Sequence, residues 1–209
     1  VLGESVLTAQ RADDGGLTLT GSAGPAIGAG PGVSVLVPAD AGDGAVWCLV
    51  DGDANGLTIV PADSIDKTRS FGSIECADVS VAADRVIEGV PEGLVRDLAA
   101  TLAAVEASGI ASWCLRTAVD YAKIREQFGK PIGSFQAIKH LCAEMLCRVE
   151  QAGAAAWDAA VAAEDAFSDG SELPIAAAVA ATVALDAAVE NAKDCIQVLG
   201  GIGFTWEHD

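Results

Sequence analysis

Residues 91–126 read PEGLVRDLAATLAAVEASGIASWCLRTAVDYAKIRE. After Pro91 it contains no further proline, and its only glycines are Gly93 and Gly109. Apolar residues recur at three- and four-residue intervals, as they do on one face of an α-helix. These positions are Leu94, Leu98, Leu102, Val105, Ala111, Leu115 and Val119. The stretch therefore predicts one long helix from Glu92 to Glu126.

A second helix is predicted after a break at residues 129–133, which read GKPIG. Ser134 is of a type that caps helix N-termini, and the Ser168-Asp169-Gly170-Ser171 segment is expected to end the helix. Its predicted inner face consists of Phe135, Ile138, Leu141, Met145 and Val149.

A third helix is predicted to begin near Pro174, because proline is tolerated in the first turn, and to end at Gly200-Gly201. Its apolar positions are Ile175, Val179, Val183, Ala187, Ala192 and Ile196. Three long helices with alanine-rich faces are expected to pack as an antiparallel bundle.

The residues before Pro91 have a different pattern. Short apolar runs alternate with glycine, aspartate and proline at the 8–12-residue spacing that is typical of antiparallel sandwiches and barrels. The runs are Leu17–Thr20, Val33–Val37, Ala45–Val50, Leu57–Val60 and Ile74–Val81. The predicted fold is therefore α+β and multidomain, with an antiparallel β-barrel or sandwich over residues 1–90 and a helical bundle over 91–209.

Composition limits the functional classes. The 209 residues include 12 Lys+Arg against 30 Asp+Glu, which gives a formal net charge of -18. Such a surface would repel a phosphate backbone, so a general nucleic-acid or membrane-surface binder is excluded. With no stretch of 18 apolar residues and no signal peptide, we expect a cytoplasmic protein without membrane insertion. The chain begins at Val1, without Met, and we expect it to be a piece of a longer protein.

Cysteine and histidine patterns give no metal site. The six cysteines occur without CxxC pairs, so they are interpreted as reduced core thiols. They are Cys48, Cys76, Cys114, Cys142, Cys147 and Cys195.

Half of the positive residues fall within positions 116–148. Clustering around a Gly/Pro break suggests a local anion site, because arginine offers a planar pair of donors to phosphate. The alternative is that these side chains decorate solvated helix faces. The residues are Arg116, Lys123, Arg125, Lys130, Lys139 and Arg148.

Two segments resemble signatures of the acyl-CoA dehydrogenase family. Residues 121–136, YAKIREQFGKPIGSFQ, resemble the family's second signature, and residues 196–207, IQVLGGIGFTWE, resemble its C-terminal Gly-Gly segment. Residues 17–21, 63–69 and 79–86 also look like parts of the family's middle β-domain. The resemblance covers essentially the whole chain.

The resemblance implies a middle β-domain and most of a C-terminal bundle, without the family's N-terminal helical domain and fourth C-terminal helix. It also implies FAD, acyl-CoA as substrate, an electron-transfer protein as acceptor, and a homo- or hetero-oligomer that is a dimer or tetramer. The cofactor-binding positions carried over are Arg125, Phe128, Gln136, Gln197, Gly200 and Gly201. Arg125 would contact the diphosphate, with Phe128 beside it and Gln136 near the ADP end. Gln197 and the two glycines would approach a flavin held by the adjacent subunit, although the glycines also suit a helix C-cap.

The sequence offers no candidate for the catalytic base. In the family a glutamate removes the α-proton of an acyl thioester while the β-hydrogen leaves as hydride. In most members this glutamate lies beyond the position that matches Asp209, and the alternative position is Ala99 here, so no catalytic residue is predicted. Asp97 matches a position that often contacts the CoA portion, but it would equally suit an exposed carboxylate in a helix's first turn.

Three further departures complicate the catalytic interpretation. Pro25 and Ile27 replace residues that usually touch the flavin ring, and Ala100 replaces an arginine. Proline has no N–H and isoleucine no hydroxyl, so a hydrogen bond to the ring is lost. The leading hypothesis is an FAD-dependent acyl-CoA dehydrogenase that forms trans-2-enoyl-CoA. The alternatives are a non-catalytic partner subunit of a heteromeric enzyme and, more remotely, an acidic helical interaction module. The acyl chain is not defined by the sequence.

Overall fold

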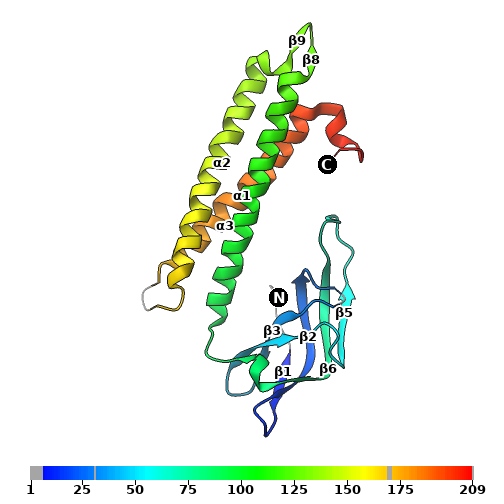
Figure 1. The fold of residues 1–209 in the computed structure, drawn as a ribbon, viewed down its shortest axis with the longest axis vertical. Helices are drawn as coiled ribbons and strands as arrows, with labels where there is room; N and C mark the ends of the chain where they lie inside the picture. Colours follow the sequence, from blue (N-terminus) through cyan, green and yellow to red (C-terminus); the bar gives the residue numbers. More distant parts are fainter. Residues whose placement is uncertain (1–6, 31, 169–170, 209) are drawn as a thin grey trace. The chain divides into compact units, whose positions relative to one another are not determined.

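The computed structural model describes residues 7–30, 32–168 and 171–208. The chain divides into two compact units, Val1–Glu92 and Gly93–Asp209. Figure 1 shows the strands of the first unit and the long helices of the second.

The first unit is a seven-stranded sheet in the order β5-β6-β2-β1-β3-β4-β7. Five of its strands, β2 to β6, overlap the predicted runs, whereas the short strands β1 and β7 were not predicted. The bounds are β1 Thr8–Arg11, β2 Leu17–Ile27, β3 Val35–Asp40, β4 Ala45–Val50, β5 Leu57–Pro61, β6 Phe71–Val81 and β7 Val86–Ile87. A 3₁₀ turn, η1, spans Ala83–Arg85.

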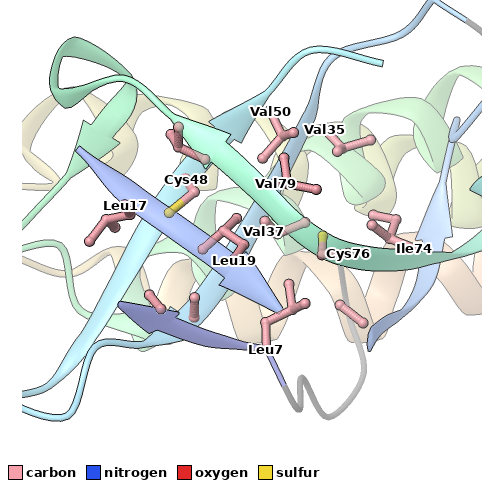
Figure 2. Packing of buried hydrophobic residues seen from close by; sticks show 14 of the residues in the cluster. Leu7, Leu17, Leu19, Val35, Val37, Cys48, Val50, Ile74, Cys76 and Val79 are labelled. Carbon is pink, nitrogen blue, oxygen red and sulfur yellow. The ribbon is translucent and has the colours of Figure 1, made fainter. Parts of the chain in front are cut away.

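The core of this unit lies inside the curled sheet. Leu17 and Leu19 of β2 point into the same space as Val37 of β3 and Val79 of β6, together with Cys48 (Figure 2). β2 and β6 pair antiparallel along their length, with register shifts between Leu19 and Gly21 and between Ala23 and Ala26. Shifts of this kind bend a strand and increase its twist, which helps the sheet to curl around one core.

The predicted β-domain is confirmed, with one difference in strand direction. β1 pairs in parallel with β3, through Thr8 and Asp40, while the other strand pairings of the unit are antiparallel. The alternation pattern predicts strands but not their direction, because both kinds of pair expose the same side-chain period.

The second unit contains three long helices that lie side by side (Figure 1). They are α1 Glu92–Ile124, α2 Gln136–Ala162 and α3 Leu173–Leu199. A short hairpin of β8 Glu126–Gln127 and β9 Lys130–Pro131 joins α1 to α2, followed by the 3₁₀ turn η2 Ile132–Ser134. Two further 3₁₀ turns, η3 Ala163–Asp165 and η4 Gly200–Phe204, follow α2 and α3.

The helix boundaries correct two predictions. Phe135, not Ser134, is the N-cap of α2, and no side chain caps that end, because Ser134 closes η2 instead. α2 ends at Ala162 rather than at the serine-rich segment, of which residues 169 and 170 lie outside the described part of the chain. The first-turn position of Pro174 in α3 is confirmed.

Alanine fills the interior of the bundle. The predicted face of α2 is confirmed, since Met145 is fully buried and its neighbours on that face are partly buried. The predicted face of α1 is confirmed in most positions but not at Leu102, which is 72% exposed, or at Val105. In α3 the prediction is wrong for half of the positions, since Ile175, Val179 and Ile196 are exposed. The small residues face inward because methyl side chains let helix backbones approach closely. The cluster comprises Ala104, Ala107, Ala111, Ala152, Ala156, Ala159, Ala176, Ala180, Ala184, Ala187 and Ala188.

One buried amide ties the three helices together. The Asn191 side chain of α3 is 0% exposed, and its Nδ2 donates to the carbonyl oxygens of Ala111 in α1 and Met145 in α2, both at 3.1 Å. Its Oδ1 accepts a 2.7 Å hydrogen bond from Nη1 of Arg148, which also bonds Asp194 at 2.8 Å. The amide is thus satisfied on both sides, as a buried polar group must be to avoid a large desolvation penalty.

Two described helical segments are long and apolar enough to cross a membrane by length and composition. These are Glu92–Ile124 and Leu173–Phe204, of which 28% and 39% of the most apolar window is buried within the unit. Helices that pack in a bundle core meet the same criterion. The absence of membrane insertion stays a prediction.

Candidate functional site

The hairpin between α1 and α2 is built by the local sequence. Phe128 and Gly129 form its tip, with left-handed φ values of 54° and 77°. Two consecutive residues of this conformation make the turn whose twist matches a two-residue hairpin, and glycine adopts it at no steric cost. A bulky aromatic residue in the left-handed region is uncommon, and at Phe128 the two-residue turn imposes this conformation.

Three side chains of this loop are ordered against one another. Phe128 is 91% exposed, and its ring meets the edge of Phe135 at a centroid distance of 6.1 Å and an interplanar angle of 83°. Nζ of Lys130 lies 4.4 Å from the centroid of the Phe135 ring. The hairpin therefore presents the exposed aromatic ring of Phe128 and the ammonium group of Lys130, which lies over the Phe135 ring.

A small apolar cluster anchors this end of the bundle. Ile132 and Ile138 pack against buried residues of all three helices, including Leu199 of α3. The N–H of Ile132 also donates to the carbonyl of Arg125 at 2.8 Å, which continues the pairing of the hairpin. The cluster therefore brings the hairpin and the C-terminal end of α3 to the same end of the unit (Figure 1). Its buried members are Cys114, Ala118, Ala122, Met145, Cys195, Val198 and Leu199.

Gly133 allows the turn to press against α1. A Cβ atom at this position would lie 2.9 Å from the carbonyl oxygen and 3.3 Å from the carbonyl carbon of Ala122. Because those atoms belong to helix backbone, they cannot move aside without distorting α1.

Gly133→Ala is therefore expected to lower the free energy of unfolding by about 1–3 kcal/mol, since the added methyl overpacks a fixed backbone. Chemical denaturation followed by circular dichroism measures the change. Gly153→Ala is the matched control, because Gly153 lies in α2 with open space around its Cβ position. That control should gain about 0.5–1 kcal/mol from helix propensity. Equal effects of the two substitutions would contradict the close-packing argument.

The Gly-Gly segment ends α3. Gly200 is the C-cap, with φ 64°, so its conformation alone favours glycine there. Cβ atoms at Gly200 or Gly201 would meet nothing within 4 Å, and Gln197 one turn earlier is exposed. The backbone at this end of α3 is therefore open to a ligand. Gly201 does not have a positive φ, so its backbone conformation does not explain why this residue is glycine.

Gln136 occupies the first residue of α2. Its Nε2 lies 2.7 Å from Nε2 of His140, one turn along, and both side chains are exposed. The contact orders the two side chains on the same face of the helix, next to the hairpin.

The positive charge of this end is not neutralised internally. Three of the six clustered cations have partners: Lys123 pairs with Asp120, Arg148 with Asp194, and Arg116 donates to Ser112. Among the described residues, Arg125, Lys130 and Lys139 pair with no carboxylate, and all three are exposed. In a chain of net charge -18, three cations without a carboxylate partner, in the hairpin and the first turn of α2, form a local attractor for anions.

The structure separates Asp97 from this group. Asp97 lies near the start of α1, and a rise of 1.5 Å per residue puts it about 40 Å from the hairpin end of that helix. Its side chain is partly buried, and its carbonyl accepts a 2.9 Å bond from the Thr101 hydroxyl. Asp97 is therefore not part of the hairpin site, and its contact with CoA stays a prediction.

The positions that depart from the family pattern lie in β2 and α1. Pro25 and Ile27 lie at the end of β2, where Ile27 is 51% exposed, and Ala99 and Ala100 are partly buried in α1. None of the four carries a group that could donate or accept a proton.

The thiols show no activation. Burial, followed by the proximity of Cys76, raises the pKa of Cys48 to about 11, and burial together with Cys114 raises the pKa of Cys195 to about 11. These thiols are protonated at neutral pH and are poor nucleophiles. The prediction of free core thiols holds for Cys48, Cys76, Cys114 and Cys195, while Cys142 is partly buried and Cys147 is exposed. Among the described residues, no group of three potential ligands could hold a metal ion.

A hollow of about 260 Å³ lies beside the hairpin, between α1 and α2. Its wall is mostly apolar, with Ile138 and Cys142 inside and the ammonium-bearing chains of Lys123 and Lys139 at its rim. Another hollow, of about 410 Å³, lies near the other ends of α2 and α3 and is lined by Asp158, Asp165 and Glu172. Carboxylate lining does not suit an anionic ligand, so the hairpin end is the better candidate site.

Two features escaped the sequence analysis. The contact of Lys130 with Phe135 depends on the hairpin geometry, although the spacing of a cation and an aromatic residue around Pro131 was a visible hint. The hydrogen bonds of Asn191 form only where the three helices meet. In the sequence, the only indication of them is a polar residue within an apolar helical pattern.

Comparison with known proteins supplies the family. Residues 97–209 match the model of the acyl-CoA dehydrogenase C-terminal domain. The chain is 54% identical over 192 residues to acyl-CoA dehydrogenase FadE34 of Mycobacterium tuberculosis, which covers 92% of this chain and 26% of that protein.

Solved structures agree with that match. Butyryl-CoA dehydrogenase from Megasphaera elsdenii is 28% identical with a TM-score of 0.83, over 97% of this chain and 55% of that one. The ChsE4-ChsE5 complex from Mycobacterium tuberculosis is 27% identical with a TM-score of 0.77, over 100% of this chain and 56% of that one. The chain thus spans about a quarter of FadE34 and about half of the solved chains. On the match over residues 97–209, and with a β-sheet unit followed by this helical bundle, the chain belongs to the acyl-CoA dehydrogenase family.

Proposed function

We propose that this chain is part of an FAD-dependent acyl-CoA dehydrogenase that converts an acyl-CoA thioester to trans-2-enoyl-CoA. Family membership supports the reaction class. The observation that carries the proposal is the group of three unpaired cations, Arg125, Lys130 and Lys139, around the exposed Phe128 in an otherwise anionic chain.

The residues at this end of the bundle fit the dinucleotide. Arg125 is exposed and has no carboxylate partner among the described residues, so its guanidinium can take a phosphate pair. Phe128 offers an apolar ring, Gln136 and Gln197 offer amides, and, among the described residues, no other segment lies within 4 Å of the Cβ positions that Gly200 and Gly201 would have. When bound, FAD would supply the acceptor for the hydride.

The chain's own contribution to the reaction is binding and orientation. Arg125 would neutralise the diphosphate and fix its position, while Gln197 and the glycine backbone would approach the ADP portion of a flavin in an adjacent subunit. Asp97 would contact the CoA portion. The base that removes the α-proton is not among the described residues, since the matching position in α1 is Ala99. Electrons would pass to an electron-transfer protein, in a cytoplasmic dimer or tetramer.

A second function is favoured by specific residues. Pro25, Ile27, Ala99 and Ala100 lack the groups that would touch the flavin ring or support a base. They favour a non-catalytic subunit that lends its bundle end to a partner's flavin. The ChsE4-ChsE5 complex, by its name, contains two different chains. The partner function predicts that turnover appears only on co-expression with a related chain, and activity of the isolated protein would contradict it.

Arg125→Ala tests the leading function. The substitution should weaken FAD binding by about 1–3 kcal/mol, because a charge-assisted phosphate contact is lost. Quenching of flavin fluorescence during titration measures the affinity.

Arg116→Ala is the matched control for that experiment. Arg116 lies in α1, two and a half turns earlier, and bonds only the Ser112 hydroxyl among the described residues. It should leave the FAD affinity within a factor of two. Unchanged affinity of Arg125→Ala, or no binding of FAD to the wild-type protein, would overturn the proposed function.

A further inference from the structure

We propose that Lys130 is a second phosphate-binding cation beside Arg125, and that Phe135 positions it. The inference rests on the proposed function, because it concerns the same dinucleotide. Nothing in the family match assigns a role to either residue.

The hairpin places the two cations on one face. Gln127 pairs with Lys130 and Glu126 with Pro131, and the bond from the N–H of Ile132 to the carbonyl of Arg125 continues the same ladder. Cross-strand partners share a face, and successive residues alternate. Lys130 is therefore a diagonal same-face neighbour of Arg125, at a Cβ separation of about 7–8 Å. Two adjacent phosphates can be contacted across that separation.

The charges around this face favour an anion. Glu126 is the nearest carboxylate in sequence, and the alternation puts it on the opposite face with Pro131. Gln127, the cross-strand partner of Lys130, is neutral and donates to the carbonyl of Glu126 at 3.0 Å. No carboxylate of the described residues pairs with Lys130, so its charge is available to a ligand.

Phe135 restricts where that charge can be. The ammonium lies 4.4 Å from the ring centroid, which is within the range of cation–π attraction. Phe135 is itself held, since its backbone N–H donates to the carbonyl oxygen of Ile132 at 3.0 Å and the Phe128 ring packs against its ring. A lysine side chain loses much conformational freedom when it is fixed on binding. Holding Lys130 over Phe135 before the ligand arrives reduces that loss.

The first experiment measures FAD affinity of the purified protein by fluorescence titration. Lys130→Gln should weaken FAD binding about tenfold at low salt. The loss should shrink at high salt, because screening weakens the contact in the wild-type protein as well. Lys130→Arg, which keeps the charge, should bind within about threefold of wild type.

Lys193→Gln is the charge-matched control. It removes one positive charge from α3, where Lys193 pairs with Glu190 at 2.7 Å. It should leave the affinity unchanged, which separates a local phosphate contact from a change in net charge.

The second experiment tests the positioning by Phe135. Phe135→Leu keeps an apolar side chain without a π-face and should weaken FAD binding about threefold. Phe135→Tyr keeps the ring and should restore the wild-type affinity. A purely structural role of Phe135 would lower the melting temperature in step with the affinity, whereas the positioning role predicts that the affinity of Phe135→Leu falls while its melting temperature stays within about 2 °C of wild type.

The outcomes separate this inference from the proposed function. If wild type binds FAD and Arg125→Ala weakens it but Lys130→Gln does not, the role of Lys130 is overturned while the function stands. Equal losses for Lys130→Gln and Lys193→Gln would also overturn it. If wild type binds no FAD, both proposals fail.

Discussion

Asn191→Ala is expected to lower the free energy of unfolding of the helical unit by about 3 kcal/mol. Asn191 makes three hydrogen bonds in the interior, two as donor to Ala111 and Met145 and one as acceptor from Arg148. Removing the amide takes all three away and leaves a void among three packed helices. Urea denaturation followed by far-UV circular dichroism, which reports the helices, measures the effect.

A second substitution separates the hydrogen bonds from the void. Asn191→Leu fills most of the volume but donates and accepts nothing, so it should still cost about 1–2 kcal/mol. Arg148 keeps Asp194 as a partner, which limits the loss. Asn55→Ala, in an exposed turn, is the control and should change stability by less than about 0.5 kcal/mol. Wild-type stability of Asn191→Leu would show that the three bonds contribute nothing net.

Ala180→Leu is expected to destabilise the bundle by a similar amount, about 3 kcal/mol. Ala180 in α3 is 0% exposed and lies in the alanine cluster with residues of α1 and α2. Three additional carbon atoms have no space there, so the helices must separate or the side chain must adopt a strained rotamer. The midpoint of thermal unfolding should fall by several degrees, with an unchanged helical spectrum at low temperature.

Ala178→Leu is the matched control, because Ala178 lies two residues earlier in the same helix and is exposed. Both substitutions have the same intrinsic helix propensity change, so only burial distinguishes them. Ala178→Leu should be within about 0.5 kcal/mol of wild type. Similar melting temperatures for the two variants would mean that the interior is not close-packed at Ala180.

The order of the long helices was predictable from the sequence, but the inward face of α3 and part of that of α1 were not. Turn residues between short apolar runs predicted strands β2 to β6, and the proline-free stretch after Pro91 predicted helix α1. In α1 and α3, however, both faces carry apolar side chains, so periodicity cannot tell the inner face from the outer one. Side-chain size determines which face is buried: Ala104 lies inside the bundle, and Leu102 lies on its surface.

The candidate site was predictable only in part. The two motifs contain Arg125, Phe128, Gln136, Gln197 and the glycines, and the elements that carry them, the hairpin, the start of α2 and the end of α3, lie at one end of the bundle (Figure 1). The left-handed conformation of Phe128 could not be read from its side chain, because an aromatic residue normally avoids that region. The position of Lys130 over Phe135 required the turn to be known first.

The alanine interior also bears on how the bundle assembles. A methyl side chain has no rotamers to lose, so bringing these surfaces together freezes backbone torsions and almost nothing else. Alanine also has the highest intrinsic helix propensity, which favours the helices before they meet. Association of the three helices therefore requires little ordering of side chains. The final arrangement is specified by the narrow space between the helices, which accepts alanine, glycine or serine and excludes longer side chains.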